Sequence, residues 1–320
     1  MKRKIVWIPL VIILLLVIVF LAGPRVVVDT ELAPVNLPDD LDSYLAESEA
    51  QFSDIVPNAE KTIIWAGEPG QKTEISAVYL HGFSATRQET APLSDNVVAE
   101  LGANLFYTRF TGHGRSGEAM AEATVNDWLN DTWEAYQIGQ RLGEKVIVIG
   151  VSTGGTAATW LAAQPNTDNL LATVLISPNF GPTDPTSEIL TWPWAEQIVN
   201  LVIGSERSWE PANEGHAQYW TESYPTRAIL PMMGLVKLTR RADLAGIQSP
   251  VLVIYSPNDT VVSPAKTEEI FAQIGVASKE IAPITDAQDE GSHVLAGDIL
   301  APNDTERVQQ LILDFVAALP

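Results

Sequence analysis

The chain alternates between short, uninterrupted apolar runs and longer segments in which apolar residues recur at helical spacing. The apolar runs are rich in β-branched residues and flanked by Gly, Pro or Ser, which is typical of strands in a sheet covered on both faces. This pattern predicts strands at residues 61–65, 75–80, 104–108, 145–149, 172–177, 251–255 and 280–284. The first two are separated by the turn sequence GEPG and are expected to form a hairpin.

Helices are predicted between the strands. Thr124 is followed three residues later by Asp127, which resembles a capping box and predicts a helix over 124–142. Acidic residues open a further helix at 39–52, which is expected to pack on the rest of the domain. The remaining predicted helices are 153–163, 264–274 and 306–319. Repeated strand–helix units predict a doubly wound α/β fold with a mostly parallel sheet.

About 70 residues between Ser177 and Val251 interrupt this alternation. The stretch is too long for a plain loop and too irregular for a single strand–helix unit. It is rich in Trp, Tyr and Met: Trp192, Trp194, Trp209, Tyr219, Trp220, Tyr224, Met232 and Met233. We predict an inserted helical cap at about 178–248, over the carboxyl edge of the sheet.

The N-terminus has a different pattern. Residues 1–4 carry three basic side chains, and the uncharged run 5–23 would form a helix about 28 Å long, close to the thickness of a bilayer core. This predicts a transmembrane anchor followed by a tether and the N-terminal helix at 24–60, with the main domain at 61–320. Under the positive-inside rule, residues 1–4 are cytoplasmic and the main domain lies outside the cytoplasm. The alternative is a cleaved signal peptide and a secreted or periplasmic domain.

Composition excludes several classes of function. Lys and Arg number 19 against 40 Asp and Glu, a net charge of −21, so a nucleic-acid partner is excluded. The chain has no cysteine, which excludes a thiol nucleophile and thiolate metal sites. Its four histidines are dispersed along the sequence, and no metal site is predicted.

One predicted strand runs directly into Gly150-Val-Ser-Thr-Gly154 and then into a helix. This is the G-x-S-x-G pattern in its strand–turn–helix context, where the glycines allow a tight turn that presents Ser152 at the edge of the sheet. A Gly-rich phosphate-binding loop would require a following Gly-Lys-Ser/Thr, which is missing. Ser152 is therefore the candidate nucleophile.

A serine nucleophile needs a base and an acid, which in this fold follow it in the order acid, then histidine. Asp259 ends the segment after the strand 251–255, and His293 follows the strand 280–284. We predict that His293 accepts the Ser152 proton and that Asp259 fixes the imidazole tautomer. Rival acids, Asp286, Asp289 and Glu290, lie on the same loop as His293 rather than after a strand.

Backbone amides are predicted to form an oxyanion hole. The strand 75–80 ends in His81-Gly82-Phe83, which aims the Phe83 N–H at the site, and the Thr153 N–H at the helix start is the second donor. His81 is expected to be a structural hydrogen-bonding residue. Gly112-His113-Gly114-Arg115-Ser116 is expected to shape a nearby loop, and His216 to be a surface or packing residue.

Five motifs together resemble the α/β-hydrolase family, in the branch that contains monoacylglycerol lipases, lysophospholipase-like enzymes and bacterial carboxylesterases. They are HGF (81–83), GHGRS (112–116), GVSTGG (150–155), SPND (256–259) and GSHVL (291–295). The resemblance covers roughly residues 62–320 and implies cofactor-free hydrolysis of carboxylic esters through an acyl-enzyme. It matches Ser152, Asp259 and His293 to the triad, and Phe83 and Thr153 to the oxyanion hole. Val151 and Thr153 depart from the GHSMGG motif usual in monoacylglycerol lipases.

The leading hypothesis is a membrane-tethered serine esterase or lipase for small esters with an apolar acyl group, bound by the cap. An amidase or peptidase on the same scaffold is the first alternative, since a triad alone does not choose between ester and amide. A non-catalytic binding protein is the second.

Overall fold

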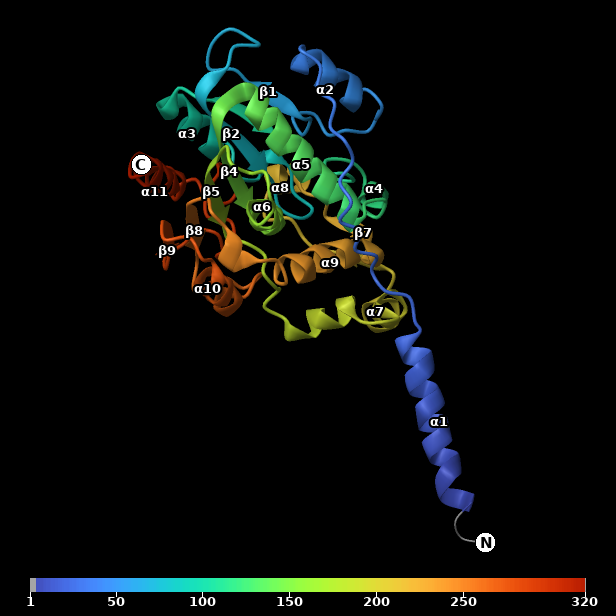
Figure 1. Cartoon of the computed structure of the whole chain (residues 1–320). Helices are drawn as coiled ribbons and strands as arrows, with labels where there is room; N and C mark the ends of the chain where they lie inside the picture. The colour runs from blue at the N-terminus through green and yellow to red at the C-terminus, as the bar shows by residue number, and fades with distance from the viewer. Residues whose placement is uncertain (1–3, 320) are drawn as a thin grey trace.

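The computed structural model describes residues 4–319, in which a seven-stranded sheet is covered by helices on both faces (Figure 1). The strand order is β1-β3-β2-β4-β5-β8-β9, and every neighbouring pair is parallel except β1 with β3. The strands are β1 (Thr62–Ile64), β2 (Thr73–Leu80), β3 (Asn104–Tyr107), β4 (Gly143–Val151), β5 (Leu170–Ile176), β8 (Val251–Tyr255) and β9 (Lys279–Pro283). The predicted doubly wound, mostly parallel sheet is confirmed.

The predicted hairpin is wrong. β1 pairs antiparallel with β3, with Thr62 opposite Tyr107, whereas β2 lies between β3 and β4. Asn104 explains the difference, because its side chain accepts from the Ala66 N–H and donates to the Gln71 carbonyl, both at the ends of the β1–β2 connection. The connection is thereby held across β3 instead of folding back beside β1.

Two groups of helices bury the two faces of the sheet in separate apolar clusters. One face is covered by α3 (Leu93–Leu101) and α11 (Thr305–Ala317), and the other by α5 (Val125–Leu142), α6 (Thr153–Ala162) and α10 (Pro264–Gln273). The Thr124–Asp127 capping box is present at the start of α5, as predicted. α3 was not predicted, although Leu93, Val97 and Val98 have helical spacing and Gly102 ends the helix at φ +59°.

Residues 178–248, which we call the insertion, connect β5 to β8. They form short helical segments and a two-stranded antiparallel ribbon, so the predicted purely helical cap needs this correction. The ribbon pairs Glu206 with Pro225, and the Ser223 hydroxyl donates to the Glu206 carboxylate. The elements are η2 (Pro185–Thr191), α7 (Ala195–Ile203), β6 (Glu206–Ser208), α8 (Glu214–Tyr219), β7 (Ser223–Pro225), η3 (Thr226–Ala228), α9 (Ile229–Thr239) and η4 (Leu244–Gly246).

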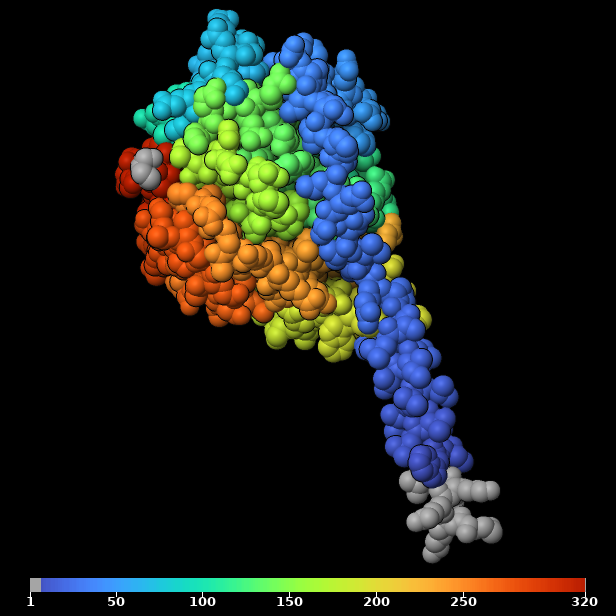
Figure 2. Space-filling view, viewed as in Figure 1, coloured from blue at the N-terminus to red at the C-terminus, as the bar shows by residue number. Residues whose placement is uncertain are grey.

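At the N-terminus, α1 (Lys4–Leu21) projects from the body of the molecule, and its apolar side chains from Trp7 to Leu21 are largely exposed (Figures 1 and 2). Among residues 7–319, the part of the chain whose side chains the structure describes, no helix is both long enough and apolar enough to cross a membrane. The predicted transmembrane helix at 5–23 is therefore not supported.

The segment predicted to be a tether lies along the body, as the blue strip in Figure 2 shows. The α5 side chains Asn126 and Asn130 hold it, through the Glu31 carbonyl and the Ala33 N–H respectively. α2 (Leu41–Glu49) follows and buries one side against the domain, as expected from the sequence.

Candidate active site

Ser152 occupies a sharp turn between β4 and α6 at the carboxyl edge of the sheet. Its backbone has φ 51° and ψ −115°, a strained conformation for a residue with a side chain. The turn is so tight that a Cβ on Gly150 would lie 2.5 Å from the Gly154 carbonyl oxygen, and one on Gly154 would lie 2.0 Å from the Leu80 carbonyl oxygen. The two glycines of the motif therefore allow α6 to pack directly on the ends of β2 and β4.

Three side chains predicted from separate strand ends meet in one hydrogen-bonded line. His293 Nε2 lies 3.0 Å from Ser152 Oγ, and His293 Nδ1 lies 2.8 Å from Asp259 Oδ2. The other Asp259 oxygen accepts from the Val261 and Val262 N–H groups at 2.8 and 2.9 Å, which fixes the carboxylate. All three side chains are buried.

The charges around His293 favour its protonated form. Burial by itself lowers the pKa of His293, but the hydrogen bond and charge of Asp259, with the charges of Glu89 and Asp289, raise it above its usual value. An imidazolium at this position is therefore stabilised.

The rival acids have other contacts. Asp289 accepts from the His293 and Val294 backbone N–H groups, so it shapes the histidine loop without touching the ring nitrogen that Asp259 holds. Asp286 pairs with Arg307, and Glu290 is exposed. Of the four candidate carboxylates, Asp259 is the one hydrogen-bonded to the imidazole.

The predicted oxyanion residues, Phe83 and Thr153, line the same cavity as Ser152 and His293. Thr153 is the first residue of α6, where backbone N–H groups are unpaired and the helix dipole is positive. Within residues 4–319, neither the Phe83 nor the Thr153 amide donates to a protein acceptor. Both amides are thus free to bind an oxygen of a substrate.

His81 fixes the loop that carries Phe83. Its Nε2 accepts from the Phe110 N–H at 3.0 Å, so Nδ1 carries the proton and donates to the Gly82 carbonyl at 2.8 Å. Burial holds the pKa of His81 well below its usual value, so the ring stays neutral. This is the structural role expected from the sequence.

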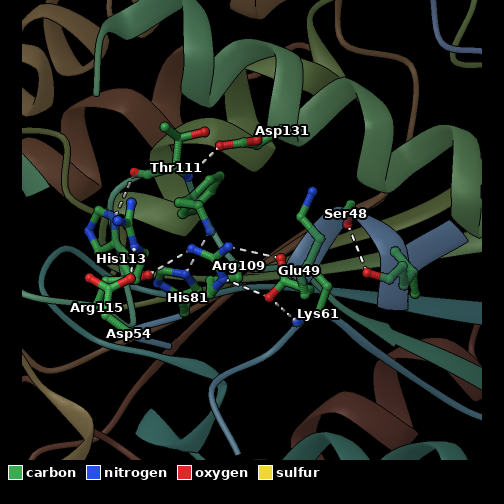
Figure 3. Close-up of polar contacts among 12 residues, drawn as sticks. Ser48, Glu49, Asp54, Lys61, His81, Arg109, Thr111, His113, Arg115 and Asp131 are labelled. Atoms are coloured by element: carbon green, nitrogen blue, oxygen red, sulfur yellow. Dashed lines mark hydrogen bonds and ion pairs between the residues drawn. The ribbon is translucent and has the colours of Figure 1, made fainter. Parts of the chain in front are cut away.

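Behind this loop lies a buried polar cluster (Figure 3). Arg109 donates to both Glu49 oxygens at 2.8 Å and to the His113 carbonyl at 3.0 Å. The His113 ring packs against the Phe83 ring with centroids 5.7 Å apart, and burial lowers the pKa of His113 to about 4. His113 therefore supports the loop as a neutral packing residue, in line with the expectation for the GHGRS segment.

A cavity of about 700 Å³ opens above Ser152. The insertion supplies most of its apolar wall: Leu190, Ile198, Val199, Val202, Ile203, Trp209, Trp220, Tyr224, Ile229 and Met232. Four of the eight aromatic and Met residues singled out in the sequence, Trp209, Trp220, Tyr224 and Met232, line it. The other four do not line it. Met233 lies in the core, and Tyr219 is half-buried at the end of α8. Trp192 and Trp194 contact the end of α1, through Phe20 and the Val19 carbonyl respectively. His216 lies between the rings of Trp209 and Trp220 at the cavity wall.

Two residues of the site carry no motif and were not predicted. Asn179 donates its N–H to the Ser152 carbonyl at 2.9 Å and its side-chain amide to Thr153 Oγ1 at 3.5 Å, bracing the turn. Glu89 is buried in the cavity lining and accepts from the Gly82 N–H at 2.8 Å. Within the described chain, no group of three or more His, Asp or Glu side chains is arranged to hold a metal ion.

Comparison with known proteins agrees with this geometry. A monoacylglycerol lipase described as thermostable, from Bacillus sp. (strain H-257), is 26% identical over 236 residues, which is 73% of this chain and 88% of that protein. Among solved structures, one described under LipS and LipT, two metagenome-derived lipolytic enzymes, superposes with a TM-score of 0.69 at 24% identity, covering 82% of this chain and 99% of that one. A soluble variant of monoglyceride lipase from Saccharomyces cerevisiae superposes with a TM-score of 0.62 at 14% identity, covering 93% and 97%.

The profile of the family described as "Serine aminopeptidase, S33" matches residues 71–293, from the start of β2 to the histidine of the site. That range includes all five motifs except the last two residues of GSHVL. The chain belongs to this family, and it is a serine hydrolase of the lipase and esterase type with the α/β-hydrolase fold.

Proposed function

We propose that the chain hydrolyses carboxylic esters with a medium-length apolar acyl group, using Ser152, His293 and Asp259 as its catalytic triad. The observation that supports this most directly is the line Ser152–His293–Asp259, with 3.0 and 2.8 Å contacts, at the base of an apolar cavity. Monoacylglycerol and monoglyceride lipases among the similar proteins favour the same substrate class.

The proposed reaction has two halves. Ser152 Oγ attacks the ester carbonyl carbon while His293 Nε2 takes its proton, and the negative oxygen is bound by the Phe83 and Thr153 N–H groups. His293 then returns the proton to the leaving alcohol oxygen as the C–O bond breaks, leaving an acyl-Ser152. A water molecule, deprotonated by His293, attacks the acyl carbon, and the acid leaves as Ser152 regains its proton. Asp259 holds the imidazole throughout.

The cavity wall predicts the acyl preference. Each methylene that moves from water to the wall of Leu190, Val199 and Ile229 contributes about 0.8 kcal/mol, so three or four added CH₂ groups should raise kcat/KM by roughly 10². In a p-nitrophenyl ester series, kcat/KM should rise from acetate to medium chains and then level off. A flat profile from acetate to decanoate would mean that the insertion does not bind the acyl chain.

Amide substrates assayed beside the ester series test the alternative of an amidase or peptidase, which the description of the family keeps open. Aminoacyl p-nitroanilides should be turned over more slowly than the best ester. Faster turnover of any anilide or short peptide would replace the esterase proposal with the peptidase one.

We further propose that α1 holds the enzyme at a membrane, with the catalytic domain outside the cytoplasm. The exposed side chains of α1 include Trp7, Leu14, Leu16 and Phe20, and leaving such a surface in water is costly. α1 (Lys4–Leu21) has 18 residues and is about 27 Å long, slightly shorter than the ~30 Å hydrocarbon core.

The full-length protein should sediment with membranes and resist extraction by 1 M salt, because apolar burial is not screened by ions. Retention after carbonate washing would favour a spanning helix, and release by carbonate a helix at the surface. A soluble mature form beginning near Gly23 would overturn the anchor and support a cleaved signal.

A further inference from the structure

Glu89, at the end of η1 (Arg87–Glu89), is a second buried carboxylate in the cavity that contains Ser152 and His293. Glu89 is 3% exposed. The nearby Arg87 guanidinium lies over the Tyr107 ring and forms no ion pair with the Glu89 carboxylate. Burying a carboxylate costs free energy, and an amide side chain would accept a hydrogen bond from the same backbone N–H at a lower desolvation cost. The position therefore calls for an explanation beyond packing.

The carboxylate holds the oxyanion loop. Glu89 Oε2 accepts from the Gly82 N–H at 2.8 Å, and a Cβ on Gly82 would lie 2.5 Å from Glu89 Oε1, so the acid sits directly on the loop. On the other side, the Gly82 carbonyl accepts from His81 Nδ1. That carbonyl and the Phe83 N–H belong to one planar peptide and point in opposite directions, so holding Gly82 from both sides sets the direction of the Phe83 N–H.

The backbone at Glu89 also lies against the loop that follows His293. A Cβ on Gly297 would lie 2.8 Å from the Glu89 carbonyl oxygen, and the Asp298 N–H donates to the Ala91 carbonyl at 2.9 Å. η1 is thus packed between the loop that carries Phe83 and the loop that follows His293.

We propose that Glu89 is a positioning residue of the hydrolase, which holds the oxyanion loop through the Gly82 amide and adds a negative charge near His293 to that of Asp259. The proposal rests on the triad proposed above. It is distinct from the role of Asp259, because Glu89 does not touch either ring nitrogen of His293; those contact Asp259 and Ser152.

The charged groups around Glu89 and His293 determine in which direction a change at Glu89 moves the pKa of His293. Glu89 faces the Tyr79 hydroxyl and His293, while His293 faces Asp259, Glu89 and Asp289. Burial raises the pKa of Glu89 to about 7, against the opposing effects of the Gly82 N–H and His293. Above pH 7 the charged Glu89 raises the pKa of His293, so removing that charge should lower it and keep the base neutral to lower pH.

Glu89→Gln tests the charge while retaining an oxygen that can accept from Gly82. The acid limb of kcat/KM should move to lower pH by about 0.5 to 1 unit, with kcat on the alkaline plateau within about threefold of the wild type. Glu89→Ala removes the acceptor as well, and kcat should fall about 10-fold or more with KM nearly unchanged, because the misdirected amide acts mainly in the transition state.

Glu74→Gln is the matched control, since it also removes one carboxylate charge. Glu74 is exposed near the start of β2, the strand whose other end leads into the loop that carries Phe83. Its pH profile should coincide with the wild type. A Glu89→Gln profile that also coincides would overturn the charge role, and unchanged kcat in folded Glu89→Ala would overturn the positioning role. If Glu89→Ala does not fold, the Glu89→Gln profile decides. Turnover retained by Ser152→Ala in the same assay would instead reject the triad itself.

Discussion

Ser152→Ala is expected to lower kcat for ester hydrolysis by about 10⁴ to 10⁶ while the protein stays folded. The variant loses the oxygen proposed to form the acyl-enzyme, and among the described residues Ser152 Oγ is the one hydrogen-bond partner of His293 Nε2. One hydroxyl is removed from the edge of a cavity, so the core packing is unchanged. Hydrolysis of a medium-chain p-nitrophenyl ester and circular dichroism would measure the two effects separately.

His293→Ala should cost about as much as Ser152→Ala, and the double variant little more than either, because the residues act as a unit. Asp259→Asn should cost the same or less, since it retains a side chain that can still hold part of the Val261 and Val262 turn. Ser48→Ala, on α2 away from the cavity, is the control and should keep wild-type kcat. If Ser152→Ala kept more than a few per cent of kcat, the nucleophile would have to be another residue.

Labelling provides a second measurement that does not depend on the choice of ester. A fluorophosphonate probe should modify the wild type at Ser152 and leave Ser152→Ala unlabelled, since the probe requires an activated serine hydroxyl. An unlabelled wild type with an intact fold would support the non-catalytic alternative.

The hydrogen-bonded line of Ser152, His293 and Asp259 could be predicted from the sequence because its signals are local. Ser152, Asp259 and His293 each follow a short apolar run, and the carboxyl ends of parallel strands meet at one edge of a sheet. The glycines beside Ser152 add a second local signal, which the close contacts of Gly150 and Gly154 explain.

Contacts between distant residues could not be predicted in the same way. The hairpin prediction failed because the choice of partner for β1 depends on an Asn104 side chain some 40 positions later. Glu89 belongs to no motif, and its proposed role depends on a hydrogen bond from Gly82 that exists only once η1 has packed on the loop.

Residues of the insertion were predicted as a group but not individually. Aromatic and Met composition indicated an apolar wall, yet which side chain faces the cavity depends on the rotation of short helices. Met232 lines the cavity and its neighbour Met233 is in the core, because adjacent residues on α9 point about 100° apart.

Glu49→Gln is expected to lower the free energy of unfolding by about 3 to 5 kcal/mol. The Glu49 and Arg109 side chains are only 9% and 4% exposed, and Arg109 makes two 2.8 Å hydrogen bonds to the carboxylate. The variant keeps the shape of the side chain but leaves the guanidinium buried without a countercharge. Urea unfolding followed by tryptophan fluorescence would give the difference.

The exposed pair Lys72–Glu144 is the matched control, with side chains 42% and 68% exposed. Glu144→Gln should cost less than about 1 kcal/mol, because water already solvates both charges. Replacing Glu49 and Arg109 together with Met should cost less than Glu49→Gln alone, since no unpaired charge is then buried. Equal effects of Glu49→Gln and Glu144→Gln would show that the buried pair contributes no more than a surface one, and that α2 is held to the domain mainly by its apolar residues Leu41 and Leu45.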